Sequence, residues 1–324
     1  MKLSVLLTTY NCENYLYAAV SSILNQTFSE FEFIIVDDGS DDNTERVVKN
    51  IADERIKYYK IEHVGRSKAL NYGLTKCNSD WVALMDGDDI AHPLRFEIQL
   101  NTINENPELD MVSSWYGIFN ENNLLYINKT PVDDTSIKKS LMLHSVISNP
   151  GVVFRKEAVM DVEGYDFLHE DYWPEDYSLW LRLIDKAIFY NIPKALIFQR
   201  YRTGSVSRKN LQLTQERIYQ LQEPYINDYI ENKSPKEKYR LLGWREYFYG
   251  RKSRVLRYWM KLNFQLVLEI KILFGIITLL LPERYFIEFK ESRLRFRLGY
   301  LLTYFTKINK ENRKIFNRII QNKN

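Results

Sequence analysis

Short apolar runs alternate with helix-like periodicity over the first 85 residues, and this alternation leaves few folds open to the chain. The strand-like runs, rich in β-branched and aromatic side chains, span residues 3–8, 31–36, 56–61 and 81–85. Between them, apolar residues recur at helical spacing, which predicts helices over about 16–24, 40–51 and 69–77. Strands that alternate with helices in this way predict an α/β fold, a mostly parallel sheet flanked by helices.

The rest of the chain divides into a mixed part and a helical part. Strand candidates lie at residues 111–119, 152–154 and 187–190, and a helix is expected over 176–184. After about Lys209 the pattern is helical to the end. We therefore expect a domain over residues 1–210 and a helical, basic and apolar C-terminal region over 211–324.

Three acidic clusters follow apolar runs, at Asp37-Asp38, at Asp86-Gly87-Asp88-Asp89 and at Glu175-Asp176. Carboxylates near a protein interior are costly unless a cation or a hydrogen-bonding ligand compensates them. Open α/β sheets bind ligands beyond the carboxyl ends of their strands, where the first two clusters fall. The pattern predicts a site that handles phosphate through a metal.

Asp38 suits recognition of a nucleobase. An ionised carboxylate only accepts hydrogen bonds, so it matches the N3–H of uracil and would repel the acceptor that cytosine presents there. Thymine and guanine carry a similar donor and are not excluded. Alternatively, Asp37, Asp38 and Ser40 form a turn and cap a helix.

Asp86 and Asp88 flank a glycine at the end of a strand, where a hard divalent cation would sit between carboxylate and diphosphate. Mg²⁺ or Mn²⁺ is the expected ion. A calcium loop fails because Ile90 and Ala91 stand where a ligand and a glycine are needed. An aspartyl-phosphate enzyme, or a solvated loop of helix-capping acids, would also explain this cluster.

Glu175 and Asp176 precede an amphipathic helix, and one of them could deprotonate a sugar hydroxyl as a general base. An acidic N-cap of that helix is the alternative.

Five motifs, taken in order, closely resemble those of family 2 glycosyltransferases with the GT-A fold. They are LLTTYN at 6–11, VDDGS at 36–40, GRSKALN at 65–71, DGDD at 86–89 and EDYSLWLR at 175–182. The resemblance covers about residues 1–210 and implies a Rossmann-like sheet and inverting, metal-assisted transfer by single displacement. The donor would be a nucleotide-sugar, with UDP favoured by Asp38. The acceptor would be a glycan or lipid-linked glycan in bacterial surface polysaccharide synthesis.

The resemblance also implies roles for single residues in nucleotide binding. Thr9 and Tyr10 would line the base pocket, with Asp38 on the uracil edge. Arg66 would lie near the base or the diphosphate. Arg202, in a stretch over residues 200–207 that resembles the family's diphosphate-binding loop, would contact phosphate.

The same resemblance implies which carboxylates do the chemistry. Asp86 would approach the ribose or sugar, and Asp88 would coordinate the metal. Asp176 would be the catalytic base, with Glu175 as the weaker candidate. Many members carry a histidine where Thr203 stands here, which leaves the third metal ligand open.

The C-terminal part carries a mixed apolar and basic pattern. Residues 272–281 form an uninterrupted apolar run that would span about 15 Å as a helix, roughly half the hydrocarbon thickness of a bilayer. A simple transmembrane helix is therefore not expected. Residues 293–298 mix arginine with apolar side chains, which favours an interfacial helix on an anionic membrane. Packing on the catalytic domain or on a partner explains the same pattern.

Composition limits the remaining choices. A net charge of +3 does not argue for nucleic acid, and two cysteines, Cys12 and Cys77, make no disulfide framework. We expect a cytoplasmic enzyme, peripheral at the inner face of the cell membrane. Two alternatives stay beside it. One is a catalytically silent membrane-associated partner of the same fold, and the other is a sugar nucleotidyltransferase. The second would need a glycine-rich, lysine-bearing loop that residues 9–13 do not provide.

Overall fold

The computed structural model describes residues 2–121, 123–166, 174–202, 211–262, 270–280, 314 and 316–318. The chain forms two compact units, residues 1–208 with 308–324 and residues 209–307. Residues 308–324 thus group with the first unit, whereas the sequence pattern assigned them to the C-terminal region. The functional roles of the two parts stay a prediction.

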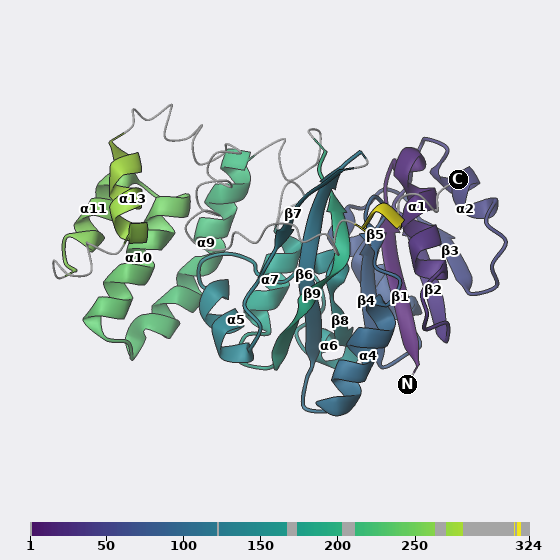
Figure 1. Ribbon diagram of the computed structural model, residues 1–324, viewed down its shortest axis with the longest axis horizontal. Helices are drawn as coiled ribbons and strands as arrows, with labels where there is room; N and C mark the ends of the chain where they lie inside the picture. The colour runs from purple at the N-terminus through teal and green to yellow at the C-terminus, as the bar shows by residue number, and fades with distance from the viewer. Residues whose placement is uncertain are drawn as a thin grey trace. The chain divides into compact units, whose positions relative to one another are not determined.

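The first unit is built on a mixed sheet with the strand order β3-β2-β1-β4-β8-β6-β9-β5, and β7 pairs with β6 (Figure 1). Four consecutive parallel strands form one half: β1 Leu3–Thr9, β2 Phe31–Asp37, β3 Ile56–Lys60 and β4 Trp81–Asp86. The other half contains β5 Ile90–Ala91, β6 Met111–Asn120, β7 Asn123–Asn128, β8 Val153–Arg155 and β9 Phe189–Arg200. Strand β8 runs antiparallel to β4 and β6, while β6 and β9 are parallel.

Helices flank this sheet. They are α1 Glu13–Leu24, α2 Thr44–Lys49, α3 Arg66–Lys76, α4 Arg95–Glu105, α5 Asp134–Leu141, α6 Lys156–Met160 and α7 Glu175–Arg182, with a 3₁₀ turn over Asn149–Gly151. The α/β fold with a sheet flanked by helices is confirmed. The sheet is mixed, because four strand pairs of its described part are parallel and four are antiparallel. Helix α4 and strands β5 and β7 were not predicted, and the strand expected at 187–190 runs to Arg200 instead.

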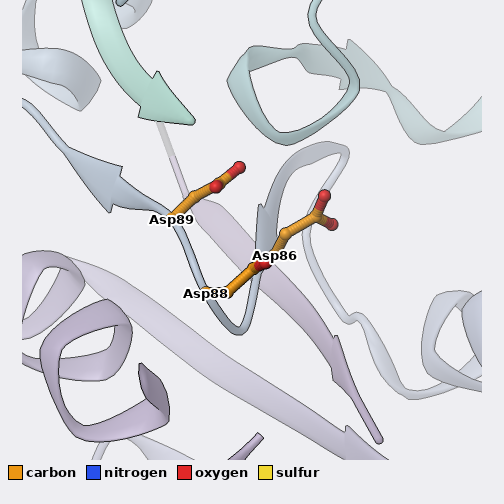
Figure 2. A group of neighbouring side chains, drawn as sticks. All are labelled: Asp86, Asp88 and Asp89. Atoms are coloured by element: carbon orange, nitrogen blue, oxygen red, sulfur yellow. The ribbon is translucent and has the colours of Figure 1, made fainter. Parts of the chain in front are cut away.

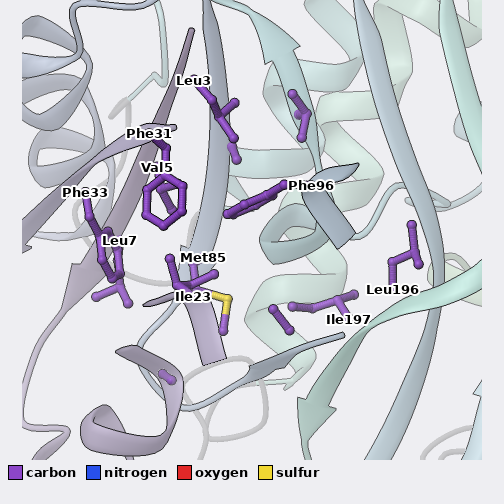
Figure 3. Close-up of a cluster of buried hydrophobic side chains, with 14 of the residues drawn as sticks. Leu3, Val5, Leu7, Ile23, Phe31, Phe33, Met85, Phe96, Leu196 and Ile197 are labelled. Carbon is purple, nitrogen blue, oxygen red and sulfur yellow. The ribbon is translucent and has the colours of Figure 1, made fainter. Parts of the chain in front are cut away.

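The main core lies between the sheet and its helices because the central strands are apolar on both faces. Every residue of β1 is buried, as expected for a strand covered on both sides. Figure 3 shows Leu3, Val5 and Leu7 of β1 gathered with Phe96 of α4 in this core. On the opposite face, a Cβ at Gly73 of α3 would meet Leu6 at 2.3 Å, so the glycine lets α3 lie close to β1.

The second unit is helical in its described residues. It contains α9 Leu211–Glu231, α10 Pro235–Tyr249, α11 Lys252–Trp259 and α13 Ile270–Leu279. A small core forms around Trp259, which packs with Tyr247, Val255 and Ile272. No helix within the described residues is long and apolar enough to cross a membrane. The basic stretch 293–298 lies outside the described residues.

Candidate active site

The carboxyl ends of β1, β2 and β4 meet at one edge of the sheet and bring two acidic clusters together. In the parallel register Thr9 pairs with Asp37, and Thr8 pairs with Asp86. Thr9 is buried, and its carbonyl accepts a hydrogen bond from the amide of Asp38 at 2.9 Å. The structure therefore places Thr9, Asp38 and Asp86 next to one another, as parallel strand ends require.

Asp37 and Asp38 are adjacent in the sequence, but their carboxylates stabilise different segments. Asp37 is fully buried, and its carboxylate accepts from the amide of Ser40 at 2.8 Å and from the Tyr58 hydroxyl at 2.5 Å. These contacts hold the turn after β2. Gly39 in that turn has a φ of +76°, and a Cβ there would meet the amide nitrogen of His63 at 2.7 Å.

Asp38 holds the loop that precedes α3. Its carboxylate accepts from the amides of Val64 at 2.8 Å and Gly65 at 3.0 Å, and His63 Nδ1 lies 3.0 Å from Oδ2. The His63 ring stacks on Tyr10, with 4.2 Å between ring centroids and 19° between planes. Tyr10 is 46% exposed, so one aromatic surface at this edge of the sheet faces solvent. His63 was not predicted as part of the site.

Arg66 joins two acidic clusters that are far apart in the sequence. One terminal nitrogen donates to Asp86 Oδ1 at 2.7 Å, and Nε lies 2.8 Å from Glu175 Oε1. Burial works against the charge of Arg66, but the carboxylates of Asp86 and Glu175 outweigh it and raise the pKa of the guanidinium. The start of α3 is thereby linked to the end of β4 and to the start of α7.

The carboxylates of Asp86, Asp88 and Asp89 gather on the turn between β4 and β5 (Figure 2). One oxygen of each lies within 4.8 Å of the others. Burial, followed by repulsion from neighbouring carboxylates, raises the pKa of Asp88 and raises that of Asp89 well above its ordinary value. This oxygen donor set and its unfavourable mutual repulsion fit a hard divalent cation.

Two arginines at the end of β9 offset part of this negative charge. Arg202 lies 2.5 Å from Asp88 Oδ2. The amide of Arg200 donates to Asp89 Oδ1 at 2.9 Å, and its Nε donates to the Asp88 carbonyl at 3.0 Å. The family resemblance implied a role for Arg202 but none for Arg200, and Asp89 was named only as part of the acidic cluster. The stretch 203–207, including Thr203, lies outside the described residues.

Glu175 and Asp176 form the first turn of α7, as predicted for an acid pair at a helix start. Burial first, and then the charge of Asp176, raises the pKa of Glu175 to about 7 against the opposing effect of Arg66. Burial also raises the pKa of Asp176, whose Oδ1 accepts from the amide of Tyr177 at 2.7 Å. Of the described residues, no cation forms an ion pair with Asp176.

The loop over residues 162–166, which was not predicted to have a structural role, is fixed from two sides. Asn71 of α3 donates to the Tyr165 carbonyl at 2.6 Å and accepts from its amide at 2.8 Å. Arg182 of α7 donates to the carbonyl of Val162 and, at 2.7 Å, to that of Gly164. These bonds tie α7, with its two acids, to α3, with Arg66.

Much of the chain is similar to known proteins. Residues 4–163 match the family model for glycosyl transferase family 2. The O-antigen biosynthesis glycosyltransferase WbnJ of Escherichia coli is 31% identical over 229 residues, which cover 68% of this chain and 88% of WbnJ. The UDP-Gal:alpha-D-GlcNAc-diphosphoundecaprenol beta-1,3-galactosyltransferase of Escherichia coli is 31% identical over 219 residues, 64% of this chain and 77% of the relative.

Solved structures share the fold. TarS of S. aureus in complex with UDP-GlcNAc aligns with a TM-score of 0.60 at 19% identity, covering 99% of this chain and 91% of TarS. The mannosyltransferase PcManGT of Pyrobaculum calidifontis, in complex with GDP-Man and Mn²⁺, aligns with a TM-score of 0.55 at 12% identity, covering 98% and 86%. The expected GT-A-type architecture is confirmed.

Proposed function

The chain belongs to glycosyl transferase family 2, and from that premise we propose that it moves a sugar from a UDP-sugar to a hydroxyl of a lipid-linked glycan. WbnJ acts in O-antigen biosynthesis, and the name of the galactosyltransferase relative gives UDP-Gal as donor and a diphosphoundecaprenol-linked sugar as acceptor. These relatives support synthesis of a bacterial surface polysaccharide as the setting.

We assign recognition of the donor base to Asp38, Tyr10 and Thr9. The Asp38 carboxylate accepts two backbone hydrogen bonds, and its oxygens have further lone pairs for the N3–H of uracil. The exposed ring of Tyr10 offers an apolar face on which a base can stack. Arg66, which pairs with Asp86, and Arg202, which pairs with Asp88, supply positive charge for the diphosphate.

The acidic turn suits a divalent cation. Asp88 is the main candidate ligand, with Asp86 and Asp89 close enough to share the ion. Bound Mg²⁺ or Mn²⁺ would offset the charge that develops on the departing nucleoside diphosphate. Arg202, which pairs with Asp88 here, can turn to the phosphate when a cation takes that carboxylate.

Asp176 is the proposed base of an inverting single displacement. Its carboxylate takes the proton of the acceptor hydroxyl while that oxygen bonds to the anomeric carbon. The bond from this carbon to the diphosphate breaks, and UDP leaves with the electron pair. Glu175 is the weaker candidate because Arg66 holds its carboxylate in an ion pair, 2.8 Å away.

One observation carries the proposal: Arg66 contacts both Asp86 and Glu175, so the donor half and the acceptor half of the site lie within reach of one side chain. The test is a transfer assay with a panel of UDP-sugars and a lipid-linked acceptor. Asp176→Asn should abolish transfer yet retain UDP binding, whereas Glu175→Gln should retain part of the activity. Undiminished turnover of Asp176→Asn would move the base to Glu175.

We further propose that the second unit contacts the cytoplasmic leaflet, where a lipid-linked acceptor would be presented. Met260 and Leu280 are 80% and 81% exposed, and the basic side chains of Arg257 and Lys261 neighbour Met260 in the sequence. Exposed apolar side chains among basic ones suit an anionic membrane surface. Liposome flotation tests this: Met260→Glu with Leu280→Glu should weaken binding to anionic vesicles, and unchanged flotation would remove the membrane contact.

A further inference from the structure

Phe316, close to the end of the chain, is fully buried in the first unit. Its ring contacts two aromatic rings of the sheet, with centroids 5.2 Å from Phe119 of β6 and 5.3 Å from Phe198 of β9. In Figure 1 this short segment, in yellow, lies beside β5. A residue more than a hundred positions after the last strand thus completes a hydrophobic cluster on the sheet.

The cluster is linked to the acidic turn through strand β5. Its other buried members include Ile90 of β5 and Phe198 of β9, which face each other in the antiparallel ladder between these strands. Ile90 immediately follows Asp89, the last carboxylate of the turn. Strand β5 has two residues, so its position depends on side-chain packing more than on a long hydrogen-bonded ladder.

A second set of contacts links the cluster to Asp88 and Asp89. The Arg200 guanidinium lies 4.5 Å from the centroid of the Phe119 ring, a cation–π distance. From there Arg200 donates to the Asp88 carbonyl, and its amide donates to the Asp89 carboxylate. Phe316 therefore packs on Phe198, whose strand β9 pairs with β5, and on Phe119, whose ring lies against Arg200.

We propose that Phe316 is a positioning residue for donor binding, an inference that rests on the proposed function of the acidic turn. Its ring packs against the rings of Phe119 and Phe198. Removing the ring leaves room into which these side chains relax, because close-packed neighbours only partly collapse around a void. Of the two rings that the Arg200 guanidinium contacts, Phe119 then becomes less fixed while Tyr15 stays in place. The turn with Asp88 and Asp89 becomes less well ordered for a diphosphate with its cation.

The test is a calorimetric titration of the full chain with UDP in the presence of Mn²⁺, together with transfer kinetics. Phe316→Ala should raise the dissociation constant of UDP and the KM for the donor about five- to tenfold, with kcat changed less than about twofold. Phe316→Leu, which keeps most of the apolar volume, should restore affinity to within about twofold of wild type. If Phe316→Ala does not fold, Phe316→Val takes its place in the series.

Two matched controls separate positioning from a general loss of stability. Asn317→Ala changes an exposed neighbour and should leave UDP binding unchanged. Ile103→Ala removes a side chain that is 2% exposed on α4, in the main core, and should lower stability without changing the KM for the donor. Equal KM increases in Ile103→Ala and Phe316→Ala would overturn the inference.

The wild-type titration separates this inference from the function on which it rests. Equal UDP affinity in wild type and Phe316→Ala would overturn the role of Phe316 alone. No UDP binding by the wild-type protein would overturn the proposed function, and the inference with it.

Discussion

Arg66 Nε lies 2.8 Å from Glu175 Oε1, which joins the first residue of α3 to the first residue of α7. The same guanidinium donates to Asp86 at 2.7 Å. A planar guanidinium can hold two carboxylates in a fixed relation, which a lysine cannot do. Under the proposed function, movement of Arg66 toward a bound diphosphate would change the charge beside Glu175, and donor binding would then change the protonation of the acid pair.

Glu175 should make stability depend on pH. Its pKa is raised from an ordinary 4.5 to about 7, so the native state binds this proton more tightly than the unfolded state. The contribution of Glu175 to the free energy of unfolding is therefore complete below pH 4.5 and is lost as the pH rises through about 7. Relative to Glu175→Gln, wild type should lose on the order of 3 kcal/mol across this window. Urea unfolding of both proteins at several pH values measures the difference, and parallel pH curves would contradict it.

Arg66→Gln should raise the pKa of Glu175 further. Removing the guanidinium takes away the positive charge that lowers the pKa of Glu175, so the midpoint should move to higher pH. The variant should also bind UDP about tenfold more weakly, because a phosphate partner is lost. The pH series and a UDP titration give both results. A lower Glu175 midpoint in the variant would show that Arg66 does not stabilise the carboxylate.

Asp38→Asn should weaken UDP binding about tenfold and reduce the preference for UDP over CDP, since the amide presents a donor as well as an acceptor. Asp37→Asn is the matched control. Its carboxylate accepts from Ser40 and Tyr58, so that change should lower stability by about 1–3 kcal/mol and leave the UDP-to-CDP ratio unchanged. Competition binding with UDP and CDP measures this preference in both variants. An equal change of the ratio in both variants would argue against base recognition by Asp38.

Arg182→Lys should affect transfer more than donor binding. Arg182 donates to the carbonyls of Val162 and Gly164, and a lysine ammonium cannot reproduce this fork. With the loop loosened, α7 and Asp176 are less well placed for the acceptor, so kcat should fall about tenfold. The dissociation constant of UDP should change less than about twofold, and Lys186→Ala, at an exposed position, should change neither. A selective loss of UDP affinity would show that Arg182 serves the donor side.

Local pattern predicted the sheet and the acidic turns well, for a physical reason. Apolar runs define buried strands, and parallel strands end at one edge, so Asp38 and Asp86 had to meet there. The part that was missed depends on contacts between distant segments. The twelve-residue strand β9 carries Arg200 to Asp89, and no local pattern in either segment indicates that pairing. The return of Phe316 to the sheet has no local signal either.

The most direct test of the account is a calorimetric titration of the purified protein with UDP, with and without Mn²⁺, on wild type and Asp88→Asn. We expect UDP binding that tightens with the metal and loses that gain in Asp88→Asn, because one of three clustered carboxylates is removed. Absence of UDP binding by wild type in both conditions would contradict it, and so would an unchanged metal effect in the variant.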